Sequence, residues 1–144
     1  MTETQNYQNH VRWFPLVHFV IMPLLALNLL WQIIRVFLDF NWDRVGSVGL
    51  AFVLMLIVLA ARLQALTVQN RVIRLEEGLR YKNILSPETA EKALQLPIGK
   101  IVALRFASDS ELPELIEKTL KGEFANSKEI KLAIKNWRGD YLRA

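Results

Sequence analysis

The sequence predicts an all-α fold: two membrane-spanning helices form a hairpin, the second helix extends into the cytoplasm, and a small helical bundle follows. Three observations lead to this prediction. Residues 14–38 contain one formal charge, Arg35, and residues 45–61 contain none. An apolar stripe of helical period continues beyond the second apolar block. The alternation of apolar and polar residues that is typical of strands is missing throughout.

The two apolar blocks divide the 144 residues into six predicted segments. A hydrocarbon core of about 30 Å needs roughly 20 helical residues to cross it, and both blocks reach that length with their flanks. The segments are an N-terminal cytoplasmic segment (1–14), a first span (15–38), a periplasmic link (39–44), a second span (45–66), a cytoplasmic helix extension (67–82) and a cytoplasmic helical module (83–144). A secretory signal peptide is the competing interpretation of the first block, but the block is too long and lacks a small-residue cleavage site.

The basic residues predict the orientation of this hairpin. A link as short as residues 39–44 makes the spans antiparallel neighbours, so both termini share one side. Arg12 precedes the first span, and a group of basic residues follows the second: Arg62, Arg71, Arg74, Arg80 and Lys82. Cytoplasmic flanks carry an excess of Lys and Arg. We therefore expect both termini in the cytoplasm, with Trp13 and Phe14 as interfacial anchors.

Polar residues mark the first span. Pro23 is expected to kink it. His18, Asn28, Gln32 and Arg35 form a loose polar line, of which the last three follow i, i+4, i+7 and share a face. The structural interpretation is a hydrogen-bonded helix–helix contact with Arg35 reaching the interface. The functional interpretation is an ion or proton path, and we favour the structural one.

Histidine and cysteine content bears on cofactors. His10 and His18 are eight residues apart, too far to share a metal on one helix, and no carboxylate is near them in sequence. Hydrogen bonding at the interface is the favoured role of His18, while haem or metal ligation and proton handling stay open. The absence of cysteine excludes disulfides, thiolate nucleophiles and Cys-ligated metals. We expect no cofactor and no metal.

Residues 67–82 are predicted to extend the second span as an amphipathic helix. An apolar stripe recurs there at i, i+4, i+7, i+11, comprising Val68, Val72, Leu75 and Leu79. A lone helix in water has no reason to carry this assembly stripe, so we expect an equivalent helix or the module to cover it. On the other face Glu76 and Arg80 are spaced for an i,i+4 ion pair. Gly78 indicates a hinge or a close packing contact.

Start and stop signals predict four helices in the module. Ser86-Pro87-Glu88 opens a helix to about Gln95. Pro97 opens an apolar helix, residues 98–107, expected to be the buried centre. The third helix has two candidate caps, Ser108 with Glu111 or Ser110, and Ser110 is favoured because it places Pro113 where the missing N–H is tolerated. Its expected core face is Leu112, Leu115, Ile116 and Leu120, with Gly122 at its end.

The last helix is expected to begin at the cap Asn126 with Glu129 and to end at Gly139. Its buried face would be Ile130, Ala133, Ile134 and Trp137. A basic stripe lies opposite and comprises Lys128, Lys131, Lys135 and Arg138. This stripe is either a solvated face or a contact with anionic lipid headgroups. Nucleic acid is not an expected partner, because no fold motif for it is present and acidic residues are interleaved.

Active-site signatures are missing from the sequence. The acidic residues Asp109, Glu111, Glu114 and Glu117 cluster at a helix start, where they are expected to act as capping and dipole partners. Phosphate-binding loops, nucleophile elbows and H-E-x-x-H zinc motifs are absent. We therefore expect a protein that is not an enzyme.

Three groups of residues carry a resemblance over essentially the full length. The first is Asn6-Tyr7-x-Asn9-His10-x-Arg12 with Pro15 and His18-Phe19, and the second is Gln69-x-Arg71-Val-Ile-Arg74-Leu-Glu76-Glu77. The third is Ala103-Leu-Arg105-Phe-Ala-Ser108-Asp109-x-Glu111-Leu-Pro113, followed by Ile130-Lys131-x-Ala133-Ile134-x-x-Trp137-Arg138 and Asp140. Together they resemble an uncharacterised family of small bacterial two-span membrane proteins. The resemblance implies the bacterial inner membrane and no assigned activity.

The expected function is that of a structural or accessory membrane protein. Its partners would be the lipid bilayer and either further copies of itself or a larger membrane complex. The alternative is a membrane enzyme or transport subunit that uses His18, Asn28, Gln32 and Arg35 as an ion, proton or cofactor site.

Overall fold

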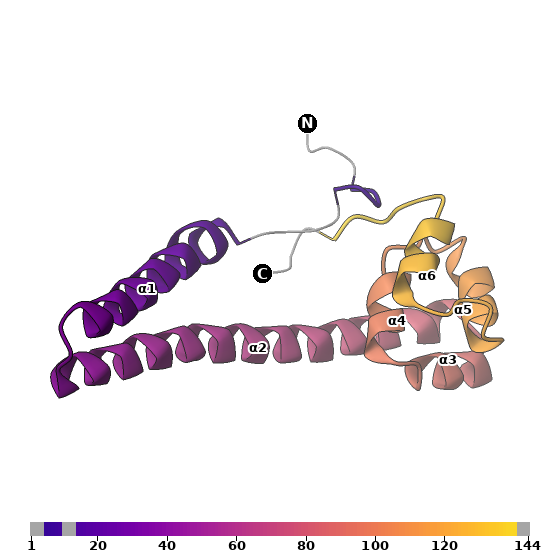
Figure 1. Ribbon diagram of the computed structural model, residues 1–144. Helices are drawn as coiled ribbons and strands as arrows, with labels where there is room; N and C mark the ends of the chain where they lie inside the picture. Colours follow the sequence, from indigo (N-terminus) through magenta and orange to yellow (C-terminus); the bar gives the residue numbers. More distant parts are fainter. Residues whose placement is uncertain (1–4, 10–13, 141–144) are drawn as a thin grey trace. The chain divides into compact units, whose positions relative to one another are not determined.

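The computed structural model describes residues 5–9 and 14–140, whose regular elements are all helices, with no strand among them. His10, Arg12 and the expected anchor Trp13 lie outside the described residues. The chain divides into two compact units, Arg12–Leu66 and Met1–Val11 with Thr67–Ala144. Figure 1 labels the helices of both units. The all-α fold class is therefore confirmed.

The first unit begins with a π-helix, η1 (Leu16–Ile21), which leads directly into α1 (Met22–Leu38). The N–H of Met22 donates to the carbonyl of Val17, five residues back, instead of the usual four. Pro23 follows in the first turn of α1, where its missing N–H is tolerated. A wider helical turn thus lies just before Pro23, and the kink expected at this residue stays a prediction.

A short link joins α1 to α2 (Trp42–Ile84). The helix begins three residues before the predicted Val45 because Asn41 caps it: the Asn41 Oδ1 accepts the N–H of Asp43 at 3.0 Å. Arg44 pairs with Asp39 across the link, with 2.6 Å between Nη2 and Oδ2. In Figure 1 α1 and the first part of α2 lead away from this link in the same general direction. The two helices are therefore antiparallel.

Two helical stretches, Leu16–Leu38 and Trp42–Ile84, are long and apolar enough to cross a membrane. In the most apolar part of Leu16–Leu38 none of the residues is buried. In the most apolar part of Trp42–Ile84 only 6% of the residues are buried. Large apolar side chains such as Leu24, Leu27, Leu50 and Phe52 lie exposed along both. A core helix of a water-soluble protein would bury them.

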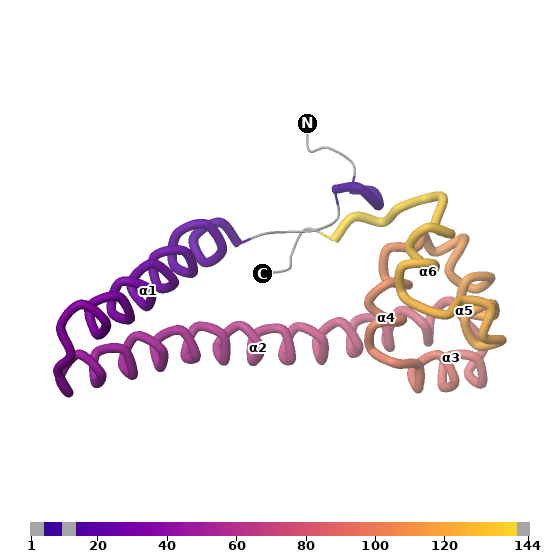
Figure 2. Tube along the Cα trace, in the orientation of Figure 1, coloured from indigo at the N-terminus to yellow at the C-terminus, as the bar shows by residue number. Residues whose placement is uncertain are grey.

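The second helix continues as one element. Figure 2 shows α2 as an uninterrupted coil from Trp42 to Ile84, in agreement with the helix predicted over residues 45–82. Gly78 does not interrupt it. A Cβ at this position would lie 3.1 Å from Cδ2 of Leu94. Gly78 therefore marks a close packing contact, one of its two expected roles.

The module contains four short helices: α3 (Pro87–Leu94), α4 (Ile98–Leu104), α5 (Leu112–Leu120) and α6 (Ser127–Ala133). Two predicted caps are confirmed, since Ser86 Oγ accepts the N–H of Thr89 and Asn126 Oδ1 accepts those of Lys128 and Glu129. Gly122 ends the α5 segment with φ at +81°. The largest fully buried side chains form most of the core: Tyr81, Ile101, Leu104, Phe106, Leu112, Ile116 and Ile130.

Two predicted helix ends are wrong for the same reason. The helices α4 and α6 stop at Leu104 and Ala133, not at Ala107 and Gly139. The segments that follow pair with each other: Arg138 N–H donates to the Phe106 carbonyl at 2.7 Å, and Ser108 N–H to that of Asn136 at 3.1 Å. This antiparallel pairing, with a bridge between Ala107 and Trp137, replaces the last helical turns.

Both caps proposed for α5 are also wrong. Its cap is Glu111, which makes no side-chain capping bond, and Ser110 Oγ bonds Ser108 Oγ at 3.0 Å instead. The Glu111 carboxylate accepts the backbone N–H groups of Lys135 and Asn136 at 3.1–3.2 Å. It therefore holds the segment after α6 in its extended form. The expected core face of α5 is correct, because Leu112, Leu115 and Ile116 are buried.

Candidate functional site

Three polar residues of α1, Asn28, Gln32 and Arg35, are joined by side-chain hydrogen bonds. Gln32 Nε2 donates to Asn28 Oδ1, and Arg35 Nη1 donates to Gln32 Oε1, both at 3.4 Å. All three side chains are half-buried. The carbonyl of Arg35 in turn accepts a hydrogen bond from Arg44 Nη1 at 3.2 Å. The line from Asn28 to Arg35 is thus a chain of side-chain hydrogen bonds that reaches the link.

The fourth polar residue, His18, is not part of this chain. It belongs to η1, and its Nδ1 lies 3.0 Å from the carbonyl oxygen of Phe14, one helical turn back. Because a carbonyl only accepts, Nδ1 carries the proton in this bond. This bond joins His18 to the residue one turn before it, at the start of the helical segment.

The assembly stripe lies on the exposed surface of α2. Val68, Val72, Leu75 and Leu79 are 61%, 47%, 66% and 60% exposed. Of the two partners expected for the stripe, the module does not cover it, because the module packs on the opposite face of the same helix, and an equivalent helix stays a prediction. That opposite face buries Ile73, Glu77 and Tyr81, which are spaced four residues apart.

A shallow groove of about 400 Å³ runs beside the assembly stripe. Leu75, Gly78, Leu79 and Leu94 give it apolar walls. Its other lining residues are basic: Arg71, Arg74 and Lys82. This edge of α2 therefore combines apolar surface with positive charge.

On the buried face of α2 Arg80 joins the helix to the module. Its guanidinium lies 3.2 Å from Glu77 Oε2 and 2.6 Å from Asp109 Oδ1. It also donates to the carbonyl of Ala107 at 2.7 Å. The predicted i,i+4 pair of Arg80 with Glu76 is wrong, because the Arg80 guanidinium bonds Glu77 and two acceptors of the module instead.

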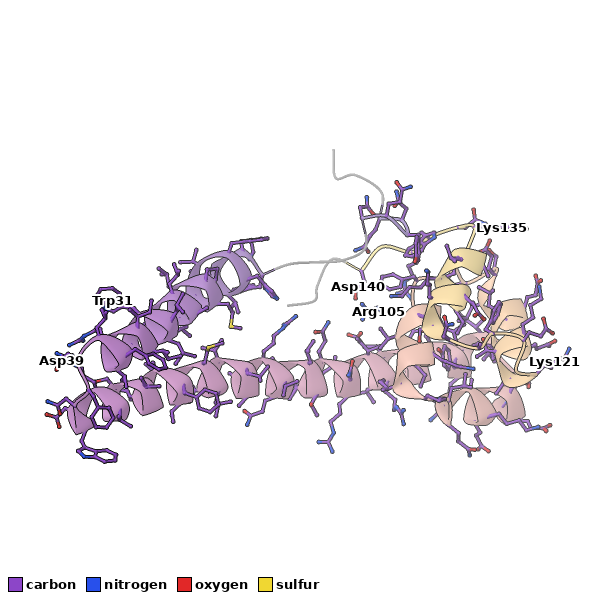
Figure 3. The ribbon with its side chains drawn as sticks, viewed as in Figure 1. Trp31, Asp39, Arg105, Lys121, Lys135 and Asp140 are labelled. Carbon is purple, nitrogen blue, oxygen red and sulfur yellow. The ribbon has the colours of Figure 1, made fainter. Side chains whose placement is uncertain are left out.

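A second ion pair closes the module at its chain end. Arg105 Nη2 lies 3.2 Å from Asp140 Oδ2, and Figure 3 shows the two side chains near one another. The Arg105 guanidinium also stacks 4.6 Å from the ring centre of Phe106. The backbone N–H of Asp140 donates to Gln5 Oε1 at 2.7 Å. This bond ties a segment that precedes α1 to a segment that follows α6.

These charges line a cleft of about 560 Å³ in the unit that contains the module. Three arginines and three acidic residues line it, namely Glu76, Glu77, Arg80, Arg105, Arg138 and Asp140. Burial raises the pKa of the Glu77 carboxyl, and the nearby Arg80 opposes the rise. Burial also raises the pKa of the Tyr81 hydroxyl. Among the described residues this hydroxyl has no hydrogen-bond partner.

The predicted basic stripe is not one helical face. Only Lys128 and Lys131 belong to α6, which ends at Ala133 because Glu111 holds the next residues extended. The Lys131 Nζ lies 5.8 Å from the centre of the Phe106 ring. Arg138 lines the cleft of Arg80 and Arg105. The four cations therefore occupy different surroundings.

Sequence reasoning missed the roles of Arg105, Asp109, Glu111 and Asp140. One signal was present: Arg105 interrupts an apolar run that ends in Phe106 and Ala107. A buried cation needs an anionic partner, and nothing in the sequence says which acid supplies it. Within the described ranges, no three His, Asp or Glu side chains gather as a metal site would require.

The comparisons with known proteins bear on family alone. The comparison with curated proteins and the comparison with solved structures each found no match. The model of a family of unknown function, DUF6526, matches residues 1–144. The chain therefore belongs to the DUF6526 family.

Proposed function

We propose that this chain is an integral protein of the bacterial inner membrane that assembles, through its helices, with itself or with a larger membrane complex. Its role is structural or accessory. The observation that carries this proposal is the assembly stripe, whose four apolar side chains stay 47–66% exposed while the other face of α2 is covered. A contiguous exposed apolar surface marks an interaction site.

The membrane part of the proposal is supported by the exposed apolar surfaces of α1 and of α2 up to Leu66. The hydrogen bond from Asp140 to Gln5 supports termini that share one side, because these residues flank both candidate spans. The excess of basic residues after the second span assigns that side to the cytoplasm.

The polar residues of α1 favour the structural interpretation over an ion path. Asn28, Gln32 and Arg35 bond in series along α1, so each side chain has a hydrogen-bond partner within its own helix. The Arg44 side chain of α2 adds a bond to the Arg35 carbonyl, and such bonds between helices stabilise helix contacts in a membrane. The alternative, a membrane enzyme or transport subunit, has no comparable observation in its favour.

Assembly is tested on the full chain in native membranes. The double variant Val72→Asp/Leu75→Asp is compared with wild type by native gel electrophoresis after mild detergent extraction. We expect wild type in a species larger than the monomer and the variant as a monomer that still resists alkaline extraction from membranes. Wild type that migrates as a monomer would refute the proposed assembly.

Topology is tested with the same cysteine-free chain. A cysteine introduced at Trp42, next to the link, is expected to react with a membrane-impermeant maleimide added from outside. Labelling of Trp42→Cys only after the cytoplasmic side is opened would contradict the orientation.

A further inference from the structure

The charged residues that flank the assembly stripe indicate which partner covers it. Val68, Val72, Leu75 and Leu79 alternate in steps of four and three residues, which is the a/d spacing of a coiled coil. With Val72 and Leu79 at a positions, Val68 and Leu75 take d positions. Arg71 then occupies a g position and Glu76 the e position five residues later. One flank of the stripe is therefore basic and the other acidic.

Neither flanking charge is paired with another residue in the described part of the chain. Arg71 and Glu76 are both exposed, and neither takes part in an ion pair among the described residues. Arg80, the expected partner of Glu76, is committed to Glu77 and Asp109. Arg71 instead lines the groove beside Leu75 and Leu79. Both charges are thus available to a partner that docks on the stripe.

We propose that the partner is a second copy of this chain, whose α2 packs in parallel and in register against residues 68–79. In a parallel pair, a g residue faces the e residue of the following heptad on the other helix. Arg71 of each copy then faces Glu76 of the other, so the dimer contains two equivalent ion pairs. An antiparallel pair would place e opposite e and g opposite g, which opposes like charges.

The buried face of α2 is compatible with this dimer. Ile73, Glu77 and Tyr81 fall at b, f and c positions, which point away from the partner in a two-stranded coiled coil. The module packs on these positions and, through Leu94, also reaches the g position Gly78. The a and d residues Val68, Val72, Leu75 and Leu79 stay exposed. The inference rests on the proposed function, because membrane anchoring of both copies at the Val68 end is what makes the helices parallel.

Because the chain contains no cysteine, single cysteines report the geometry without background. The full-length variants Val68→Cys, Leu75→Cys and Leu79→Cys are reconstituted separately in neutral phosphatidylcholine vesicles and oxidised with copper phenanthroline. All three are expected to form disulfide-linked dimers, since equivalent positions meet only in a parallel pair in register. Arg74→Cys, at an exposed c position, is the matched control and is expected to remain monomeric.

The ion pairs are tested by charge exchange on the Leu75→Cys background. Each single exchange breaks both symmetry-related pairs. Arg71→Glu and Glu76→Arg are each expected to lower the cross-linked fraction by about threefold, since two exposed pairs that contribute about 0.3 kcal/mol each give about 0.65 kcal/mol together. The double exchange restores the opposite pairing and is expected to return the fraction to the wild-type level. Failure of the double exchange to restore it would overturn the Arg71–Glu76 pairing.

Other outcomes identify other occupants and overturn the second copy. Cysteines on the stripe that stay monomeric but are shielded from maleimide indicate the lipid surface. Cross-links in native membranes to a different chain, with none in vesicles, indicate a heterologous partner. In that case a large native species shows that the proposed assembly function stands while the dimer fails. If the protein is a monomer in native membranes and forms no cross-links, both the proposed assembly function and the dimer are refuted.

Discussion

The two faces of α2 beyond Leu66 differ in how their side chains are satisfied. One face buries Ile73, Glu77 and Tyr81 against the module and joins it through Arg80. The other leaves four apolar side chains exposed between Arg71 on one flank and Glu76 on the other, neither of which forms an ion pair among the described residues. The difference teaches that amphipathicity alone does not say which face a domain covers. Here the module takes the face that contains a buried charge, and the more apolar face remains for a partner.

The largest effect is expected from truncation on the buried face. Tyr81→Ala removes a fully buried aromatic ring from the module core and should lower the free energy of unfolding by about 3–5 kcal/mol. Leu79→Ala, two residues earlier on the exposed face, should change it by no more than about 0.5 kcal/mol in the monomer. Hydrogen exchange of the α4 and α5 amides in the full chain in detergent measures both. Equal effects would mean that the faces are not distinct.

Charge removal gives the next largest contrast. Arg80→Met leaves Glu77 buried without its ion pair and should destabilise the module by about 3 kcal/mol. Arg71→Met removes an exposed cation that has no ion-pair partner among the described residues, and it should leave module stability unchanged within about 0.5 kcal/mol. Urea titration, followed by hydrogen exchange of the α4 and α5 amides, measures the stability of both variants. A stable Arg80→Met variant would contradict the joining role of Arg80.

A smaller, pH-dependent effect is expected at Glu77. Its pKa is raised by burial, against the opposing charges of Arg80, Arg138 and Arg105, so the folded chain binds its proton more tightly than the unfolded chain. Stability from this group is therefore highest at acid pH and falls as pH rises from the ordinary carboxyl pKa through the raised one. Glu77→Gln should gain stability relative to wild type as pH rises to about 7. A constant difference between the two proteins would rule out this titration.

The smallest effect is expected from the Tyr81 hydroxyl. It is buried without a hydrogen-bond partner in the described part of the chain. Removing an unsatisfied buried hydroxyl is neutral or stabilising. The free energy of unfolding of Tyr81→Phe should therefore equal that of wild type or exceed it by up to about 1 kcal/mol. Thermal unfolding of the full chain in detergent compares the two. Clear destabilisation would show that the hydroxyl has a partner.

Local chemistry explains which parts of the fold were predictable. The continuous α2, the caps Ser86 and Asn126 and the end of α5 at Gly122 follow from signals a few residues apart. The ends of α4 and α6 were not predictable in this way. They depend on pairing between residues 106–108 and 136–138 and on Glu111, 24 residues before Lys135, and periodicity carries no information about such contacts.

In the candidate site, too, features that depend on local spacing were predictable, and features that depend on distant contacts were not. The assembly stripe was visible from its spacing, and so was the shared face of Asn28, Gln32 and Arg35. Which face of α2 the module would cover was not visible, because it depends on Arg80 finding Asp109 and the carbonyl of Ala107 across the module. The prediction of a basic stripe was wrong because it required a helix that continues to Arg138, whereas α6 ends at Ala133.

The most direct test of the central claim is cysteine accessibility along residues 68–81 in native membranes. Each exposed position is replaced singly by cysteine, and the rate of maleimide labelling from the cytoplasmic side is compared with that in detergent-dispersed monomer. The account predicts slowed labelling in membranes at Val68, Val72, Leu75 and Leu79 and unchanged labelling at Arg74. Labelling of those four positions as fast as Arg74→Cys would show that the exposed face of α2 has no partner.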